Sequence, residues 1–202
     1  LQGEVNGNLC VGGIAGAAYN SIIHKCITLS STDVSGYVAH TGGIAGDSSS
    51  DVLWCENNAT VNGADNTGGI VGFNLYQGLI KLCTNKGLVI ANSSVGGIAG
   101  YNMGEIMHCA NYAAPVGFNN IGGICGVNML YAVVSSCENF AEIYIPVDYS
   151  PAENVGGIVG YNRSAEISFS INNGNLLKEG MGGNLGGIAG QSFGGYINGC
   201  IN

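Results

Sequence analysis

Apolar and polar residues recur along this chain in blocks that return every 26 to 34 residues. Each block contains the pattern Gly-Gly-Ile-x-Gly, in which the fourth residue is small and apolar. The first glycine of the pattern occurs at Gly12, Gly42, Gly68, Gly96, Gly122, Gly156 and Gly186. Because self-similarity at a nearly fixed period is typical of repeat proteins, the pattern predicts a stack of about seven copies of one unit.

A second block, Cys-x-Asn-x-(Ala or Gly)-x-(Val or Ile), follows each Gly-Gly pair after 13 to 15 residues. Clear copies begin at Cys55, Cys83 and Cys137, whereas the copies at Cys26 and Ser170 are weaker. A spacing of two residues is that of a β-strand, so these side chains share one face of a strand. An apolar residue three positions before each cysteine breaks this alternation, which predicts a bend between the two residues.

One unit of this length is too short to bury its own apolar face, and stacking on its neighbours solves the problem. The period of two excludes helical repeats, so we expect an all-β fold, a parallel β-helix (β-solenoid) of about seven coils spaced about 4.8 Å apart. Parallel crossovers are nearly always right-handed, so we expect a right-handed β-helix. Residues 1–202 then form a single repeat domain, which we expect to be a segment of a longer protein with flanking domains.

Stacking also explains why asparagine recurs at fixed places in the repeat. One column follows the cysteines, and another follows the Gly block at Asn74, Asn102, Asn128 and Asn162. A buried amide without a partner costs about 1–3 kcal/mol, whereas stacked amides can donate to one neighbour and accept from the other. The glycines themselves leave two interpretations open, which are positive φ at a bend and close approach of another backbone.

Composition excludes some classes of function. Charged residues make up 9% of the chain, and the net charge is −8 with only five Lys and Arg. A nucleic-acid-binding protein needs a cationic surface that displaces counterions from phosphates, so we expect no nucleic acid partner. No apolar run reaches the roughly 18 residues of a membrane-spanning helix, so we expect no membrane span in this segment.

Eight cysteines allow several interpretations. A disulfide ladder, a zinc site and a nucleophile each fit the spacing poorly, and we favour small buried thiols that fill the coil interior. Cys10 differs, because it occupies the position of His40 and Asn66 in later repeats and could be exposed. The three histidines lie at unlike positions in their repeats. We therefore expect no metal site, no cofactor and no catalytic residue.

The longest insertion, residues 145–154, is the candidate region for ligand contact. It carries Asp148, Tyr149 and Glu153, and Tyr144 directly precedes it. Binding residues concentrate on loops that a rigid scaffold holds, although a solvated surface loop is the plainer interpretation. Other outer aromatic residues could stack on sugar rings or on a partner protein, or be merely scattered on the surface. With Tyr144 and Tyr149, this set comprises Tyr76, Tyr112 and Phe140.

The block Gly-Gly-Ile-x-Gly-(aromatic)-Asn, followed by an apolar-x-x-Cys strand, resembles the GLUG repeat of bacterial surface proteins. Clear copies are residues 96–102 and 156–162, and the resemblance covers nearly the whole chain. This chain has Ile where the family usually has Leu. The resemblance implies a location at the bacterial cell surface or in secreted, extracellular proteins. Such proteins include adhesin-like proteins and immunoglobulin A peptidases, in which the repeats form a non-catalytic part.

These observations favour a non-catalytic surface repeat region that acts as an adhesin or as a ligand-presenting scaffold or spacer. Its partner could be a host protein or a glycan, and we do not expect an enzyme. The alternative is a polysaccharide-active β-helix enzyme, a lyase or hydrolase. Such an enzyme needs two or three acidic groups on one outer face, and no single repeat acquires several at once.

Overall fold

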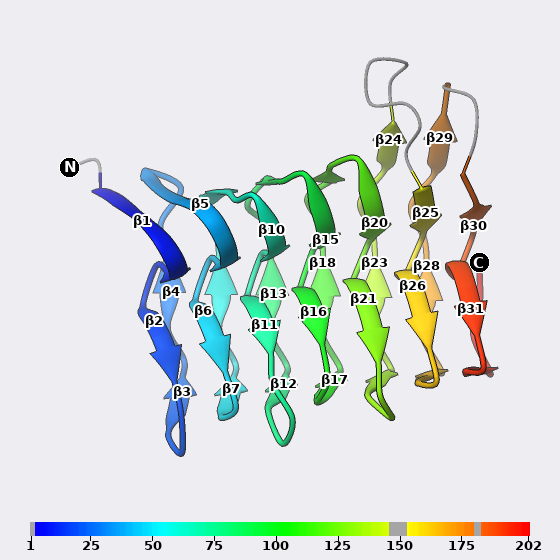
Figure 1. The fold of residues 1–202 in the computed structure, drawn as a ribbon, viewed down its shortest axis with the longest axis horizontal. Coiled ribbons are helices and arrows are strands. Elements are labelled where there is room, and N and C mark those ends of the chain that lie inside the picture. The colour runs from blue at the N-terminus through cyan, green and yellow to red at the C-terminus, as the bar shows by residue number, and fades with distance from the viewer. Residues whose placement is uncertain (1–2, 146–152, 180–182) are drawn as a thin grey trace.

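The chain forms a stack of turns that run along one axis from the N-terminus to the C-terminus (Figure 1). The structure is a computed structural model that describes residues 3–145, 153–179 and 183–202. Every paired strand in these ranges is parallel to its neighbour, and the strands form five sheets. The predicted all-β parallel solenoid of about seven turns is confirmed. The described residues include no helix, and therefore none that could cross a membrane.

Sheet A is the largest, with ten strands, and seven of them end at the first glycine of a Gly-Gly pair. Its strands are β1 (Gly3–Gly12), β5 (Thr32–Gly42), β9 (Thr60–Asn62), β10 (Asp65–Gly68), β14 (Val89–Ile90), β15 (Ser93–Gly96), β19 (Pro115–Val116), β20 (Asn119–Gly122), β25 (Glu153–Gly156) and β30 (Leu185–Gly186). Sheet B, with seven strands, continues each turn after the bend at the Gly-Gly pair. Its strands are β2 (Ala15–Ala18), β6 (Ala45–Ser48), β11 (Val71–Asn74), β16 (Ala99–Asn102), β21 (Cys125–Met129), β26 (Val159–Arg163) and β31 (Ala189–Phe193).

Sheets C and D complete the turns. Sheet C comprises β3 (Ile22–His24), β7 (Asp51–Leu53), β12 (Leu79–Lys81), β17 (Glu105–Met107), β22 (Val133–Ser135), β27 (Glu166–Ser168) and β32 (Tyr196–Asn198). Sheet D comprises β4 (Ile27–Thr28), β8 (Glu56–Asn57), β13 (Thr84–Asn85), β18 (Ala110–Asn111), β23 (Glu138–Asn139) and β28 (Ile171–Asn172). Two further strands, β24 (Ile143–Ile145) and β29 (Leu176–Lys178), form the small sheet E.

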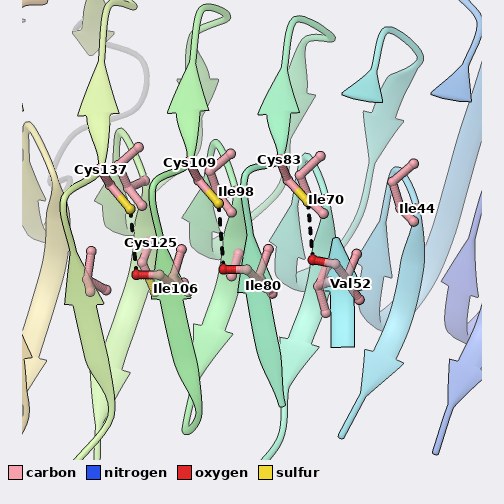
Figure 2. Packing of buried hydrophobic residues seen from close by; sticks show 14 of the residues in the cluster. Ile44, Val52, Ile70, Ile80, Cys83, Ile98, Ile106, Cys109, Cys125 and Cys137 are labelled. Carbon is pink, nitrogen blue, oxygen red and sulfur yellow. Dashed lines mark hydrogen bonds between the residues drawn. The ribbon is translucent and has the colours of Figure 1, made fainter. Parts of the chain in front are cut away.

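Like residues meet like residues along the stack. Gly42 pairs with Gly68, Ile80 pairs with Ile106, and Asn111 pairs with Asn139. This register places the isoleucines of the five interior Gly blocks in a continuous core, which Figure 2 shows for Ile44, Ile70 and Ile98. These isoleucines are fully buried, so the stacking of turns supplies the hydrophobic stabilisation that a single turn lacks.

The cysteines of the second block are buried thiols in this core, as predicted. From the second turn onward, each of these thiols donates to a carbonyl of the preceding turn, and the dashed lines in Figure 2 mark Cys83 to Val52, Cys109 to Ile80 and Cys137 to Ile106. All eight cysteines are free, and those of the two end turns, Cys26 and Cys200, are only partly buried. Burial raises the pKa of the Cys109 thiol well above its usual value, so this thiol stays neutral.

The predicted bend before each cysteine is confirmed. In each of the seven turns, the residue directly before the cysteine position has a positive φ, between 50° and 62°. These residues are Lys25, Trp54, Leu82, His108, Ser136, Phe169 and Gly199. The left-handed residue turns the chain from sheet C to sheet D, and it allows both the apolar residue and the cysteine to face the interior.

Close approach, and not positive φ, explains the glycines of the Gly-Gly pairs. No glycine of these pairs has a positive φ in the described residues. A Cβ added to Gly43 would lie 2.2 Å from the carbonyl oxygen of Gly69 and 2.3 Å from the side-chain Cγ of Asn57. Any side chain at Gly43 would collide with the backbone of the next turn and with the buried side-chain amide of Asn57.

Both asparagine columns form hydrogen-bonded ladders, as predicted. In the first, each Nδ2 donates to the Oδ1 of the next turn at 2.8–2.9 Å, through Asn57, Asn85, Asn111, Asn139, Asn172 and Asn202. In the second, the distances are 2.7–3.0 Å through Asn74, Asn102, Asn128 and Asn162. Amides that are satisfied in this way can be buried at little cost, and they hold the turns in register.

Candidate binding groove

One outer face of the solenoid, along sheet C, carries two adjoining hollows of about 510 and 420 Å³. Tyr131 and Val133 line both, so the two hollows form one groove that runs across successive turns. The strands β7, β12 and β17, at the lower edge of Figure 1, belong to this face. We call the combined feature the sheet C groove.

The floor of the groove alternates between acidic and apolar residues. One floor residue comes from each strand of sheet C from β7 to β32, in the paired order Asp51, Leu79, Glu105, Val133, Glu166 and Tyr196. Five of these six residues directly precede a fully buried core residue, and Tyr196 precedes Ile197 of the same column, so strand alternation turns their side chains outward. Carboxylates therefore recur on every second turn, at intervals of about 9.5 Å if neighbouring strands lie about 4.8 Å apart.

Three tyrosines lie along the groove on the turns between the carboxylates. Tyr76, Tyr131 and Tyr196 are 69%, 88% and 77% exposed, so their ring faces are open to a ligand. Tyr131 has a positive φ of 67°, and its amide donates to the carbonyl of Ser164 on the next turn at 2.8 Å. The backbone that carries the central ring is therefore bonded to the scaffold.

The chemistry of the groove suits a ligand with flat apolar faces and hydrogen-bond donors. Aromatic rings stack on apolar faces, and carboxylates accept hydrogen bonds from hydroxyl or amino groups. No Lys, Arg or His lines the hollows within the described ranges. An anionic ligand would meet uncompensated carboxylates in the groove and a net charge of −8 on the chain.

The candidate contacts near residues 145–154 do not form part of this groove. Tyr144 lies in β24 of sheet E, and Glu153 begins β25 of sheet A, so the two residues belong to different sheets. A hydrogen bond to Glu179 raises the pKa of the Tyr144 phenol. Asp148 and Tyr149 lie outside the described residues.

The outer aromatic residues divide into two groups. Tyr76 lines the groove, whereas Tyr112 and Phe140 stack on each other with ring centroids 4.8 Å apart and planes 4° from parallel. Tyr112 and Phe140 directly follow neighbouring strands of sheet D, so the pairing of similar residues in adjacent turns continues on the outer surface.

Sequence reasoning missed Tyr131, Tyr196 and the alternation of the floor. The signal is present one position before each buried residue of sheet C, where Asp51, Glu105 and Glu166 occupy alternate turns. It is visible only when the repeats are aligned on that buried column. Tyr196 belongs to the same column, whereas Tyr76 and Tyr131 carry no such signal because they lie in loops of unequal length.

Comparison of the chain with protein-family models, with curated proteins and with solved structures finds no match. The resemblance to GLUG repeats therefore stays a prediction. The functional assignment depends on the geometry and chemistry of the sheet C groove.

Proposed function

We propose that this chain is a non-catalytic repeat scaffold of a bacterial surface or secreted protein, and that it binds an extended glycan along the sheet C groove. The observation that carries the proposal is the regular alternation of exposed tyrosines and carboxylates along the stack. The resemblance to GLUG repeats of adhesin-like proteins supports an extracellular role of this kind.

The spacing in the groove favours a polymer over a single sugar. Tyr76, Tyr131 and Tyr196 belong to alternate turns, and alternate turns lie about 9.5 Å apart along the stack. This interval is roughly the length of a disaccharide unit in an extended chain. A rigid scaffold with a fixed spacing pays little ordering cost when it binds a ligand with a matching repeat.

The charge of the groove favours a neutral or amino-bearing glycan. Asp51, Glu105 and Glu166 can accept hydrogen bonds from sugar hydroxyls and can pair with protonated amino groups. The same carboxylates would repel the uronate or sulfate groups of an acidic polymer. We therefore expect discrimination by charge as well as by shape.

The acidic floor also makes a polysaccharide-active enzyme the second candidate. Retaining glycosidases place two carboxyl groups about 5–5.5 Å apart, and inverting enzymes about 6.5–9.5 Å apart. The floor carboxylates start from backbones about 9.5 Å apart, with an apolar residue between them. This spacing is wider than a retaining site and at the limit of an inverting one, so we favour binding over cleavage.

A panel of soluble polysaccharides tests the proposal. Affinity electrophoresis and calorimetry would compare a neutral β-linked glucan, partly deacetylated chitin and a polyuronate. We expect binding to the neutral or amino-bearing polymers and none to the polyuronate. Absence of binding to all three polymers would overturn the glycan proposal, and release of reducing ends or unsaturated products would overturn the non-catalytic one.

Variants locate the binding site. Removal of the central ring by Tyr131→Ala should weaken binding two- to tenfold, because one aromatic contact contributes about 0.5–1.5 kcal/mol. The control is Tyr37→Ala, which removes a tyrosine that is 65% exposed and lies outside both hollows. Equal affinity of the two variants would exclude the sheet C groove as the binding site.

A further inference from the structure

A second cluster of functional side chains lies near the N-terminal end of the stack, outside the sheet C groove. Cys10 of β1 and His40 of β5 occupy neighbouring turns, and Asp47 lies in β6 of sheet B. The Cys10 Sγ is 3.2 Å from Asp47 Oδ2, and the His40 Nδ1 is 2.7 Å from Asp47 Oδ1. The ligating atoms of all three side chains lie within 4.8 Å of one another.

Asp47 is buried, and its interaction with His40 is not a well-formed hydrogen bond. Only 7% of Asp47 is exposed. Although His40 Nδ1 and Asp47 Oδ1 are close, neither atom has a hydrogen-bond partner of acceptable geometry among the described residues. A buried carboxylate in this state carries a large desolvation cost, which a bound cation would offset.

The cluster is a departure from the repeat. In later turns, the column of Cys10 and His40 contains Asn or Ser, and Asn154 and Asn184 form a small ladder with Asn120. The column of Asp47 contains Phe73 and Tyr101 on the next turns. Stacking therefore does not require a thiol, an imidazole or a carboxylate at these positions. Local departures from an otherwise consistent pattern are expected at functional sites.

We propose that Cys10, His40 and Asp47 form a binding site for a divalent transition-metal ion of the zinc class. Such ions accept sulfur, nitrogen and carboxylate ligands together, whereas Mg²⁺ and Ca²⁺ prefer oxygen alone. Bond lengths of about 2.0–2.3 Å place tetrahedral ligand atoms about 3.3–3.8 Å apart. Small side-chain rotations bring the three ligating atoms to that spacing, and a water molecule completes the coordination.

Neighbouring residues hold the ligands in place. The Phe73 ring packs edge-on against the His40 ring, with centroids 5.0 Å apart. The Tyr19 hydroxyl lies 3.5 Å from Asp47 Oδ2, where it can donate a hydrogen bond to the carboxylate. Such outer contacts orient metal ligands and contribute to affinity.

A catalytic thiol is the competing interpretation, and the geometry opposes it. In a nucleophilic cysteine site the base lies next to the thiol and the thiol pKa falls. Here the carboxylate lies against the thiol, with Asp47 Oδ2 3.2 Å from Cys10 Sγ, and the His40 Nδ1 lies next to Asp47 Oδ1. Binding of a metal ion would displace the thiol proton, so that one Sγ–metal bond forms and one proton is released to solvent.

The ion would tie two turns together near one end of the stack. Cys10 belongs to the first turn, while His40 and Asp47 belong to the second. A ligand that binds only the folded state stabilises it by mass action. We therefore expect Zn²⁺ to raise the unfolding temperature of the metal-free protein.

Titration of chelator-treated protein with Zn²⁺ and Co²⁺ tests the site. Calorimetry should give one ion per chain, and Co²⁺ should produce the near-ultraviolet absorption band of a thiolate–cobalt bond. The substitution Cys10→Ser should remove this band and weaken Zn²⁺ binding at least tenfold. The substitution His40→Asn should also weaken binding at least tenfold, and Asn66 occupies the same column with positive φ, so the fold should persist.

The matched control is Cys200→Ser, which changes a partly buried cysteine at the other end of the stack. Ser170 occupies the same column one turn earlier, so the scaffold tolerates this substitution. We expect the control to bind Zn²⁺ and Co²⁺ like the unsubstituted chain. Absence of stoichiometric binding, or equal affinity of the Cys10→Ser and Cys200→Ser variants, would overturn the proposal. Unfolding curves for each variant identify any loss of the fold.

Discussion

At the scale of the residue, the left-handed backbone before each cysteine has the clearest energetic consequence. Six of these seven positions carry a side chain, although the left-handed conformation costs an L-residue roughly 1–2 kcal/mol. This cost is offset because the bend lets both the cysteine and the apolar residue three positions before it face the interior. Only the last turn has glycine there, at Gly199.

His108 is exposed and has a φ of 53°, so glycine should relieve strain there without loss of packing. We expect His108→Gly to raise the free energy of unfolding by up to about 1 kcal/mol, measured by chemical denaturation. The control Glu138→Gly, at an exposed position of β23 without positive φ, should lower it by about 0.5–1 kcal/mol. If both variants lose stability alike, the bend stores no strain.

At the scale of the element, the asparagine ladders are units that depend on their interior members. Asn111 accepts from Asn85 and donates to Asn139, both at 2.9 Å. Its Oδ1 also accepts from the backbone of Ala113. Removal of this amide therefore takes the acceptor from one side-chain N–H of Asn85 and from the backbone N–H of Ala113, and it takes one of the two donors from Asn139 Oδ1.

Asn111→Ala should lower the free energy of unfolding by about 2–4 kcal/mol, since each unsatisfied buried group costs about 1–3 kcal/mol. Asn173→Ala is the control, because Asn173 is exposed and directly follows a ladder residue. We expect it to change stability by less than about 0.5 kcal/mol. Denaturant midpoints that coincide for the two variants would show that the ladder contributes nothing to stability.

At the scale of the whole molecule, stability depends on position along the stack, because each turn contacts only its neighbours. Ile106 and Ile197 occupy the same column of sheet C, yet Ile106 is fully buried and Ile197 is 45% exposed. The difference arises because Ile197 has a described turn on one side only. The metal site that we propose lies near the opposite end, where it would tie the first two turns together.

Truncation of this column at its centre and at its end measures the effect. Ile106→Ala should cost about 2–5 kcal/mol, as expected for a fully buried isoleucine. Ile197→Ala should cost less than half as much, because the Ile197 side chain buries less apolar surface on folding. Equal losses in thermal or chemical unfolding would contradict the nearest-neighbour description of the stack.

Much of the fold was predictable because the repeat encodes it several times. Cys83, Asn85 and Ile98 each belong to a column of like residues. Such a column can be recognised in the aligned repeats without knowledge of the backbone angles. The bend before Cys83 was predictable from a broken alternation. The role of the Gly-Gly pairs was not predictable, because a positive φ and the close approach of another backbone both favour glycine.

The candidate sites were predicted less well. Sequence reasoning selected Tyr144, Asp148, Tyr149 and Glu153 from the longest insertion, whereas the groove formed on the regular face of sheet C. It placed Cys10 and His40 in one column but did not connect Asp47 with them. The expectation of no metal site came from comparing repeats one column at a time, and Asp47 belongs to another column.

The sequence by itself determined the number of repeats, the parallel stack and the identity of the inward columns. These features follow from spacing along the chain, and like residues in neighbouring turns must meet when the turns stack. Only the tertiary structure decided which columns face each other across a bend and where the loops carry Tyr76 and Tyr131. Those contacts depend on the angles between sheets and on the paths of loops, which the spacing of residues does not specify.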